Sequence, residues 1–437
     1  MSFLSVRRCL RASRLLLAMA CVLAALPVCA ANSDTTLSLD AATRMAVQRA
    51  PQVRSQRLRT QAARHDAVRA GRLPDPRLTV GINNLTVTGP QAFNAAAAPM
   101  TMRSIGLTQA IPSHAKRAAE KAVARAAVHL DDANVVKVRL AVRQAAAGAW
   151  VRLWAAQTER NQLAALQAQS RLAVKLAKAR LAGGTGSATD VLAARSALVR
   201  LDNRITAVDA SMASARAALQ RWVGDAATRP LDEAPDFSTL PVPPDALRRR
   251  LNRQGPLLGW AAREDRAQAR LALAEAGKHP DWSVSLMYGD RIRLPDMVGI
   301  QVGVSLPLFS GNRQDQDISA RHAERDAVQA AHENARRAQR AAVQADLAEW
   351  RGDTRQVATY RDKLLPLAAD RSRTALASYR AGGSLQPWLE ARRDEIDTRI
   401  DYAEALAAWG QAWAQLAYLI PDHDTAAPTG AVQERLP

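Results

Sequence analysis

The chain has 437 residues, with 60 Lys or Arg against 41 Asp or Glu, and a formal net charge of +19. A basic balance of this size would suggest nucleic acid in a cytoplasmic protein. Here the basic residues are spread along predicted helices and aromatic residues make up only 4% of the chain. We therefore expect no nucleic-acid partner, and a solvated basic surface or an anionic lipid neighbour instead.

Residues 1–30 have the three parts of a secretory signal peptide. Four arginines precede an uncharged apolar stretch at residues 15–28, and Val28-Cys29-Ala30 offers small residues for cleavage. All three cysteines lie in this segment, so the mature chain would have no disulfide framework and no cysteine metal site. Acylation of Cys29 is an open alternative, because Leu26 is placed as in a lipoprotein signal, although Pro27-Val28 is a poor fit.

The mature chain is predicted to contain two copies of one unit. A shift of 197 residues superposes three pairs of segments: residues 105–108 with 302–305, Gly186 with Gly383, and residues 192–195 with 389–392. Each copy reads as helix, strand, loop, strand, long helix, glycine break and long helix. The predicted organisation is a first repeat at 31–232, a Pro-rich extended linker at 233–245, a second repeat at 246–422 and a disordered tail at 423–437.

The predicted strands alternate apolar residues with small or polar ones. The clearest runs are residues 78–82, 282–288 and 298–306. Such a pattern is typical of a barrel wall that faces lipid outside and water inside, although a half-buried hairpin of a soluble sheet has the same period. Four strands cannot enclose a water-filled barrel, so the first interpretation requires several chains. Its lipid-facing candidates are Val80, Trp282, Val284, Ile300, Val302 and Val304.

The helices are predicted to be unusually long. Residues 116–181 contain no proline and are rich in alanine and arginine, so one helix over this span would be roughly 100 Å long. After the glycine break, apolar residues recur at alternating spacings of three and four from Leu198 to Trp222, and again from Tyr402 to Leu419. This periodicity indicates coiled-coil seams.

No motif points to catalysis, and we predict that the chain is not an enzyme and has no cofactor or bound metal. No two of the seven histidines are four residues apart. The sequence Gly183-Gly184-Thr185-Gly186 lacks the lysine of a phosphate-binding loop. Met100 and Met102 could contact a soft cation, but packing in a loop is their ordinary explanation.

This arrangement resembles that of the TolC-like outer-membrane efflux proteins, over essentially the whole mature chain. Residues 73–76 (LPDP), 83–90 (NNLTVTGP) and 100–107 (MTMRSIGL) are similar to the heavy-metal, cation-efflux branch of that family. The resemblance implies a mainly α protomer with a small transmembrane β part. It also implies a homotrimer, in which three chains with four strands each form one twelve-stranded barrel and a helical tunnel.

In function, the resemblance implies the outer-membrane channel of a tripartite efflux system, a passive conduit for heavy-metal cations from the periplasm to the exterior. The expected partners are outer-membrane lipid, a periplasmic adaptor protein and an inner-membrane resistance-nodulation-division pump. Two alternatives remain open. One is a channel of the same fold for drug efflux or type I protein secretion, and the other is a periplasmic adaptor, against which the duplicated hairpin argues.

The resemblance also assigns roles to the two glycine breaks, which would be the turns at the periplasmic tip of the tunnel. The residues implied in adaptor docking are Gly183, Gly184, Leu192, Gly382, Gly383 and Leu389. Asp190 and Glu390 are candidates for an acidic constriction of the lumen. Pro387, followed by Trp388, stands where a second acid of the last hairpin is expected, so the sequence departs from a double acidic ring.

Overall fold

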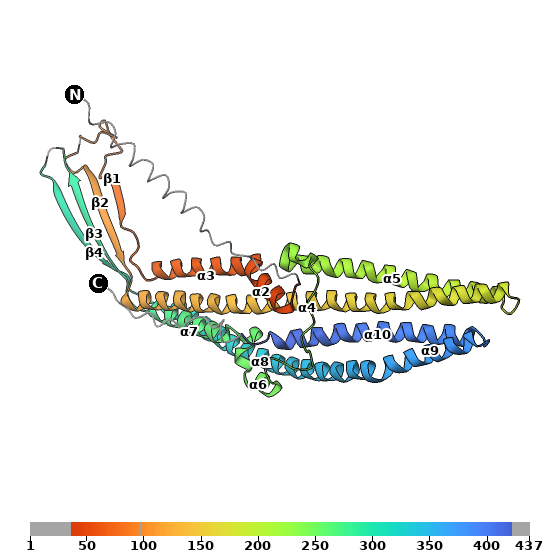
Figure 1. Cartoon of the computed structure of the whole chain (residues 1–437). Helices are drawn as coiled ribbons and strands as arrows, with labels where there is room; N and C mark the ends of the chain where they lie inside the picture. The colour runs from red at the N-terminus through yellow and green to blue at the C-terminus, as the bar shows by residue number, and fades with distance from the viewer. Residues whose placement is uncertain (1–35, 97, 293, 422–437) are drawn as a thin grey trace, which may run out of the picture.

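A computed structural model describes residues 36–421, except residues 97 and 293. The predicted signal peptide, its cysteines and the tail at 423–437 lie outside these residues. Long helices run side by side as a rod, with a four-stranded sheet at one end and two helix turns at the other (Figure 1). No helix within the described part of the chain is long and apolar enough to cross a membrane.

The first repeat is dominated by one unbroken helix. Its elements are α2 (Leu39–Arg49), α3 (Pro51–Arg69), β1 (Arg77–Asn83), β2 (Met102–Ile111), α4 (His114–Ala182) and α5 (Ala188–Val223). Helix α4 has 69 residues, so the prediction of a single rod over residues 116–181 is confirmed. It begins at Ser113, whose Oγ accepts a hydrogen bond from the Lys116 backbone N–H, which satisfies one of the free donors of the first turn.

The second repeat has the same order of strands and helices. After the short turn η1 (Gly224–Thr228) come α6 (Pro244–Arg249), η2 (Leu251–Arg253), η3 (Gly255–Leu257), α7 (Trp260–Ala276), β3 (Trp282–Asp290), β4 (Met297–Val304), α8 (Gln314–Thr359), the π-turn η4 (Tyr360–Leu364), α9 (Leu365–Arg380) and α10 (Gln386–Ala417). The π-turn has no counterpart in α4. Pro366 follows it and cannot donate to the carbonyl of Asp362, which explains why the helix deviates here.

The sheet joins the two repeats. Its order is β1-β2-β3-β4, with every pair antiparallel. In one row Val80 lies opposite Ile105, which lies opposite Tyr288. Strand β4 ends at Val304, two residues before the predicted end. The backbone N–H of Ser305, the next residue, donates a hydrogen bond to the Asp281 carbonyl at 2.9 Å.

One carboxylate fixes the sheet to the helical rod. Asp281, just before β3, accepts from the Ser113 backbone N–H at 2.8 Å and from Lys116 Nζ at 3.0 Å. Both partners belong to the first turn of α4 or its cap. An acid at a helix N-terminus is also favoured by the helix dipole. The first strand of repeat two is thereby tied to the longest helix of repeat one.

The segment at 233–245, predicted from its prolines as an extended linker, packs against the helices. Phe237 is fully buried, with edge-on contacts to Trp154, Trp409 and Trp413. The Trp350 indole donates to the Phe237 carbonyl at 2.9 Å. The prolines still fix the extended backbone of this segment. Burial of a side chain as large as that of Phe237 stabilises the packing of the segment against the helices. The composition of the segment alone did not indicate this packing.

A tryptophan indole also donates to a backbone carbonyl at the start of the first repeat. The Trp150 indole donates to the Leu37 carbonyl at 2.9 Å, and Leu37 is fully buried. The main core therefore combines residues from 37 to 420. Along α5, Leu201, Ile205 and Val208 are buried, which confirms that the seam of threes and fours is core.

Candidate functional site

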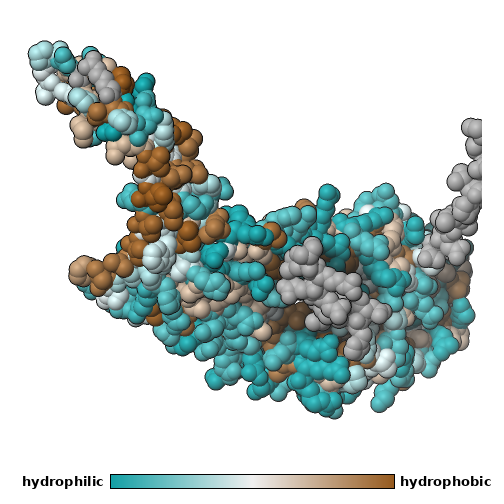
Figure 2. Space-filling model, turned by 90° about the vertical axis from the view of Figure 1, so that its left-hand side faces the viewer, coloured by the Kyte–Doolittle hydropathy of each residue, from teal (hydrophilic) through white to brown (hydrophobic). Residues whose placement is uncertain are grey.

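The sheet has one apolar face that is exposed in the single chain. The register brings large apolar side chains from all four strands onto this face. Val80 is 73% exposed and Ile300 75%. The set comprises Leu78, Val80, Ile82, Ile105, Leu107, Trp282, Val284, Leu286, Tyr288, Val298, Ile300, Val302 and Val304. Figure 2 shows the hydrophobic residues gathered along the arm formed by the sheet, whereas the helical body is mostly hydrophilic.

The opposite face of the sheet, here called the inner face, is lined by small and hydroxyl-bearing residues. Thr108 Oγ1 and Ser285 Oγ are 2.9 Å apart, and the Ser104 hydroxyl donates to the Gly81 carbonyl. A hollow of about 260 Å³ runs over this face. The face consists mainly of Thr79, Gly81, Ser104, Gly106, Thr108, Ser283, Ser285, Gly299, Gln301 and Gly303. A sheet with these two faces can separate an apolar medium from water.

The two glycine breaks form the tip at the other end of the rod. Gly184 has φ of +73° and Gly382 of +106°, a region that favours glycine. The helix pairs α4/α5 and α9/α10 reverse there, as the sequence predicted. A buried apolar cluster, here called the tip cluster, lies directly behind the turns and holds the two hairpins together. It consists of Ala173, Ala177, Val191, Ala194, Leu376, Tyr379, Leu385 and Trp388.

Arg180 connects the two turns, although they are about two hundred residues apart in sequence. Its Nη1 donates to the carbonyls of Tyr379 (3.2 Å) and Gly383 (2.9 Å). Its Nη2 donates to Gly382 (3.2 Å) and, more weakly, to Thr185 (3.5 Å). The guanidinium also lies 4.8 Å from the centre of the Tyr379 ring. The planar fork of arginine suits such a set of acceptors, which lysine could not serve together.

A buried charged group lies further along the two hairpins from the tip, at the level of Gln169 in α4. Arg392 and Glu395, both less than 5% exposed, form an ion pair at 2.7 Å. Glu395 also accepts from Arg399 at 2.9 Å, and Arg392 donates to Gln169 of α4. Burial lowers the pKa of the Arg392 guanidinium, Glu395 opposes this and Arg399 adds to it. The guanidinium of Arg392 nevertheless stays charged, so it needs the carboxylate of Glu395 beside it as a counter-charge.

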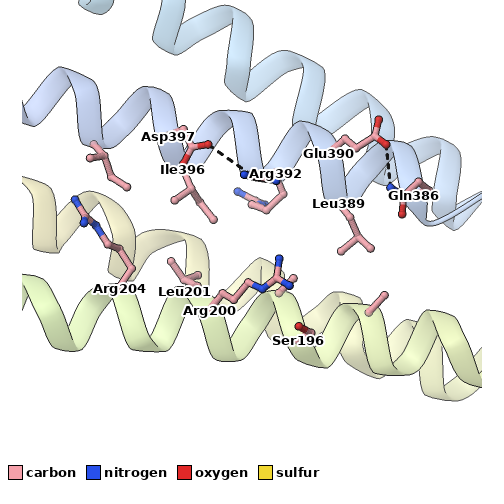
Figure 3. A pocket seen from close by; sticks show the side chains of 14 residues that line it. Ser196, Arg200, Leu201, Arg204, Gln386, Leu389, Glu390, Arg392, Ile396 and Asp397 are labelled. Carbon is pink, nitrogen blue, oxygen red and sulfur yellow. Dashed lines mark hydrogen bonds and ion pairs between the residues drawn. The ribbon is translucent and has the colours of Figure 1, made fainter.

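The two leucines assigned to the tip lie in different surroundings. Leu192 is 65% exposed, whereas Leu389 is partly buried against the tip cluster. Leu389 also lines a groove of about 560 Å³ between α5 and α10. Figure 3 shows Arg200, Leu201 and Ile396 along the same groove. The groove therefore combines apolar and basic side chains.

The two acidic candidates also differ in their surroundings. Asp190 lies in the first turn of α5, three residues after the N-cap Ser187, a place where a carboxylate stabilises a helix. Glu390 is exposed, and its Oε1 accepts from Gln386 at 2.9 Å (Figure 3). Pro387, which stands where a second acid was expected, is exposed, and Trp388 after it is only 1% exposed and packs in the tip cluster.

Within the described residues, no group of three or more His, Cys, Asp or Glu side chains could hold a metal ion. The functional residues that the sequence missed are Arg180, Arg392 and Glu395. Their partners come from distant parts of the chain, so no local pattern signals them.

Arg180→Ala is expected to loosen both turns, because it removes four hydrogen bonds to backbone carbonyls, two of them half-buried and two exposed, worth roughly 0.5–1.5 kcal/mol each. Amide hydrogen exchange should speed up at residues 181–187 and also at 381–385. Arg171→Ala, which removes an exposed arginine of the same helix, should leave both turns unchanged. Faster exchange in the first turn alone would contradict the proposed connection.

Comparison with known proteins places this architecture in context. The profile of the family described as outer membrane efflux protein matches residues 42–225 and 247–420. No curated protein sequence matches the chain. Among solved structures, CusC, described through its transmembrane channel formation, superposes with a TM-score of 0.75 at 15% identity, over 88% of this chain and 92% of that chain.

Two further solved structures are similar. A membrane protein from Pseudomonas aeruginosa gives a TM-score of 0.73 at 18% identity, over 87% of this chain and 93% of its own. The outer membrane protein VceC from Vibrio cholerae gives 0.70 at 16% identity, over 87% of this chain and 95% of its own. At these identities the likeness is one of fold. The predicted mainly α protomer with a small sheet is confirmed.

Proposed function

Because the chain belongs to the outer membrane efflux protein family, whose members are channels rather than enzymes, we propose that it is the outer-membrane component of a tripartite efflux system. Three copies would close their sheets into one barrel in the outer membrane. Their helices would continue as a tunnel into the periplasm. The channel would be a passive conduit, and the driving force would come from an inner-membrane pump of the resistance-nodulation-division type.

The observation that carries this proposal is the pair of contrasting faces on an open sheet. Strands β1 and β4 pair with only one described neighbour each, so each offers a row of backbone donors and acceptors to another copy. The helices nearest the sheet follow the same order, since α3 contacts α4, α4 contacts α7 and α7 contacts α8. Joining the edge of one copy to the opposite edge of the next would extend both layers at once.

The height of the apolar face supports a membrane location. Strand β3 has 9 residues, which span about 30 Å at ~3.4 Å per residue before any tilt. Barrels of the outer membrane have an apolar band about 25 Å tall. A tilted wall of these strands would therefore match the lipid layer, with Val80, Trp282 and Ile300 toward the lipid.

The tip is proposed as the docking end for a periplasmic adaptor. Gly183, Gly184, Gly382 and Gly383 leave the turns free of bulky side chains. Exposed Leu192 and half-buried Leu389 would supply apolar contact. Threefold repetition would bring three copies each of Glu390 and Asp190 around one axis and raise the local concentration of cations.

The proposed cargo is a heavy-metal cation, by resemblance to the metal branch and in keeping with a constriction lined by Glu390. A channel of this kind must release its cargo, so tight ligand clusters along the rod are not required. Drug efflux through the same fold is the competing candidate, and the cargo would then be set by the pump.

Two measurements test these proposals separately. The purified protein should migrate as a heat-resistant trimer in detergent and conduct ions in planar lipid bilayers, and a soluble monomer without conductance would refute the channel. A strain that lacks the chain should become more sensitive to heavy-metal cations. Normal metal tolerance together with dye accumulation would refute the cargo and leave the channel intact.

A further inference from the structure

Methionine is concentrated at the sheet. Of six methionines in the described residues, four lie in the strands or the adjoining outer loop, although these make up a small part of the chain. The strand members are Met102, Met287 and Met297, and Met100 precedes them in the loop. Met45 and Met212 lie elsewhere, in α2 and α5. Methionine is not a favoured strand residue in the way that β-branched residues are, so the clustering calls for an explanation.

The strand register places the three methionines around one glycine on the inner face. Met297 is the direct partner of Gly289 across β3 and β4. Met287 precedes Gly289 by two residues on the same strand, so both lie on one face. Met102 comes from the other side, since a Cβ built on Gly289 would clash with its sulfur. The thioether of Met102 therefore rests on the glycine.

These positions bring three sulfurs within reach of one ion. Directly opposed residues have Cβ atoms about 4.5–5.5 Å apart, and diagonal neighbours about 7–8 Å apart. Met102 already lies over Gly289, next to Met297, and Met287 is diagonal to Met297. With three rotatable bonds, a methionine side chain can carry its sulfur several ångströms toward a shared point. Gly289 has no side chain to occupy that point.

The chemistry of this cluster selects a narrow class of ligand. Thioethers are soft, neutral donors, which suit Cu⁺ and Ag⁺ and bind Zn²⁺ or Co²⁺ poorly without imidazole or thiolate. Arg103 and Asp290 of the neighbouring strands lie on the apolar face and form an ion pair with each other at 2.5 Å. Two of the three side chains are open to solvent at the inner face, because Met287 is 37% exposed and Met297 50%.

We propose that Met102, Met287 and Met297 form a thioether site for a soft monovalent cation, Cu⁺ or Ag⁺, on the inner face of the sheet near its outer end. The site rests on the proposed function, since the inner face becomes the wall of a lumen only when copies close the barrel. It narrows the cargo from heavy-metal cations to monovalent thiophilic ones. Three neutral ligands would hold such an ion briefly, as a conduit requires.

Simple packing is the alternative, because Met102 also fills the space over Gly289. Leucine replaces methionine with little change in volume, usually at a cost below about 1.5 kcal/mol, and it removes the sulfur. The decisive variant is therefore Met102→Leu/Met287→Leu/Met297→Leu. Met45→Leu/Met212→Leu is its matched control, with the same substitution away from the sheet.

The experiment titrates detergent-solubilised trimer with Ag⁺ and measures bound metal by equilibrium dialysis. The natural protein and the Met45/Met212 control should bind Ag⁺ saturably, and the triple variant should lose this binding while remaining a trimer of unchanged conductance. Zn²⁺ should show no binding that depends on the three methionines. X-ray absorption of Cu⁺-loaded protein should report sulfur ligands that the triple variant lacks.

Equal Ag⁺ affinity in the triple variant, or no saturable binding by the natural protein, would overturn the site. If the trimer still conducts in that case, the proposed channel stands and only this inference fails. If the protein neither forms a trimer nor conducts, the proposed function fails and the lumenal site fails with it.

Discussion

Phe237→Ala is expected to lower the free energy of unfolding by about 3–5 kcal/mol, the usual cost of deleting a fully buried aromatic ring. The side chain is 0% exposed. The centre of its ring lies 5.3 Å from the ring centre of Trp413 and 5.4 Å from that of Trp409, in T-shaped contacts. Removal would leave a cavity between α4 and α10, because these neighbours are held by their own hydrogen bonds and cannot easily collapse.

Two graded variants make this prediction specific. Phe237→Leu should cost clearly less, since most of the apolar volume remains. Trp413→Phe keeps an aromatic ring but removes the N–H that donates to the Thr239 carbonyl, and should cost about 1 kcal/mol. Denaturant unfolding of the detergent-solubilised protein, followed by far-ultraviolet circular dichroism, ranks the three. A Phe237→Ala variant as stable as the natural protein would show that the segment is a loose linker after all.

Glu395→Ala is the second substitution with a large expected effect. It leaves the buried Arg392 guanidinium without its main counter-charge, a situation that typically costs about 3–5 kcal/mol. The paired Asp394 on the same helix provides the control, because its ion pair with Arg371 is largely exposed and Asp394→Ala should cost at most about 1 kcal/mol.

The double variant Arg392→Met/Glu395→Leu separates the cost of an unmatched charge from the cost of lost packing. Both buried charges disappear together, and Arg399, which also loses Glu395 as its partner, is partly exposed to water, so stability should return most of the way toward that of the natural protein. The same denaturant unfolding measures all three variants, and limited proteolysis near the tip reports the local effect. A double variant as unstable as Glu395→Ala would mean that the attraction between Arg392 and Glu395 holds the hairpins together. The cost of a buried charge without a partner would then not explain the effect of Glu395→Ala.

The long elements could be predicted from sequence because their signals are local. A helix is signalled by the absence of proline over 116–181 and by the spacing of apolar residues in α5. The strands are signalled by alternation. Each of these patterns can be read within a few neighbouring residues. The glycine turns were equally visible, since positive φ at Gly184 and Gly382 requires a particular residue type. The apolar and inner faces of the sheet follow from alternation alone.

The contacts that organise the site could not be predicted, because they join residues whose proximity depends on the complete fold. Arg180 looks like any arginine of a basic helix until α9 and α10 bring the second turn to it. Trp388 follows the position where an acid was expected, and only its packing in the tip cluster shows that it is a core residue. The cluster of methionines around Gly289 needs the register of three strands.

The main core has a consequence for how the protein is made. It contains Leu37 and Ile420 together, and Gly255 donates to the Leu419 carbonyl at 2.8 Å. If the predicted signal peptide directs export of the chain from its N-terminus, the apolar residues of α2, α4 and α5 would stay exposed until the segment after α10 had also been translocated. Contacts of such long range also slow folding. We expect the newly exported chain to depend on a chaperone that binds apolar segments, and to mature after translocation rather than during it.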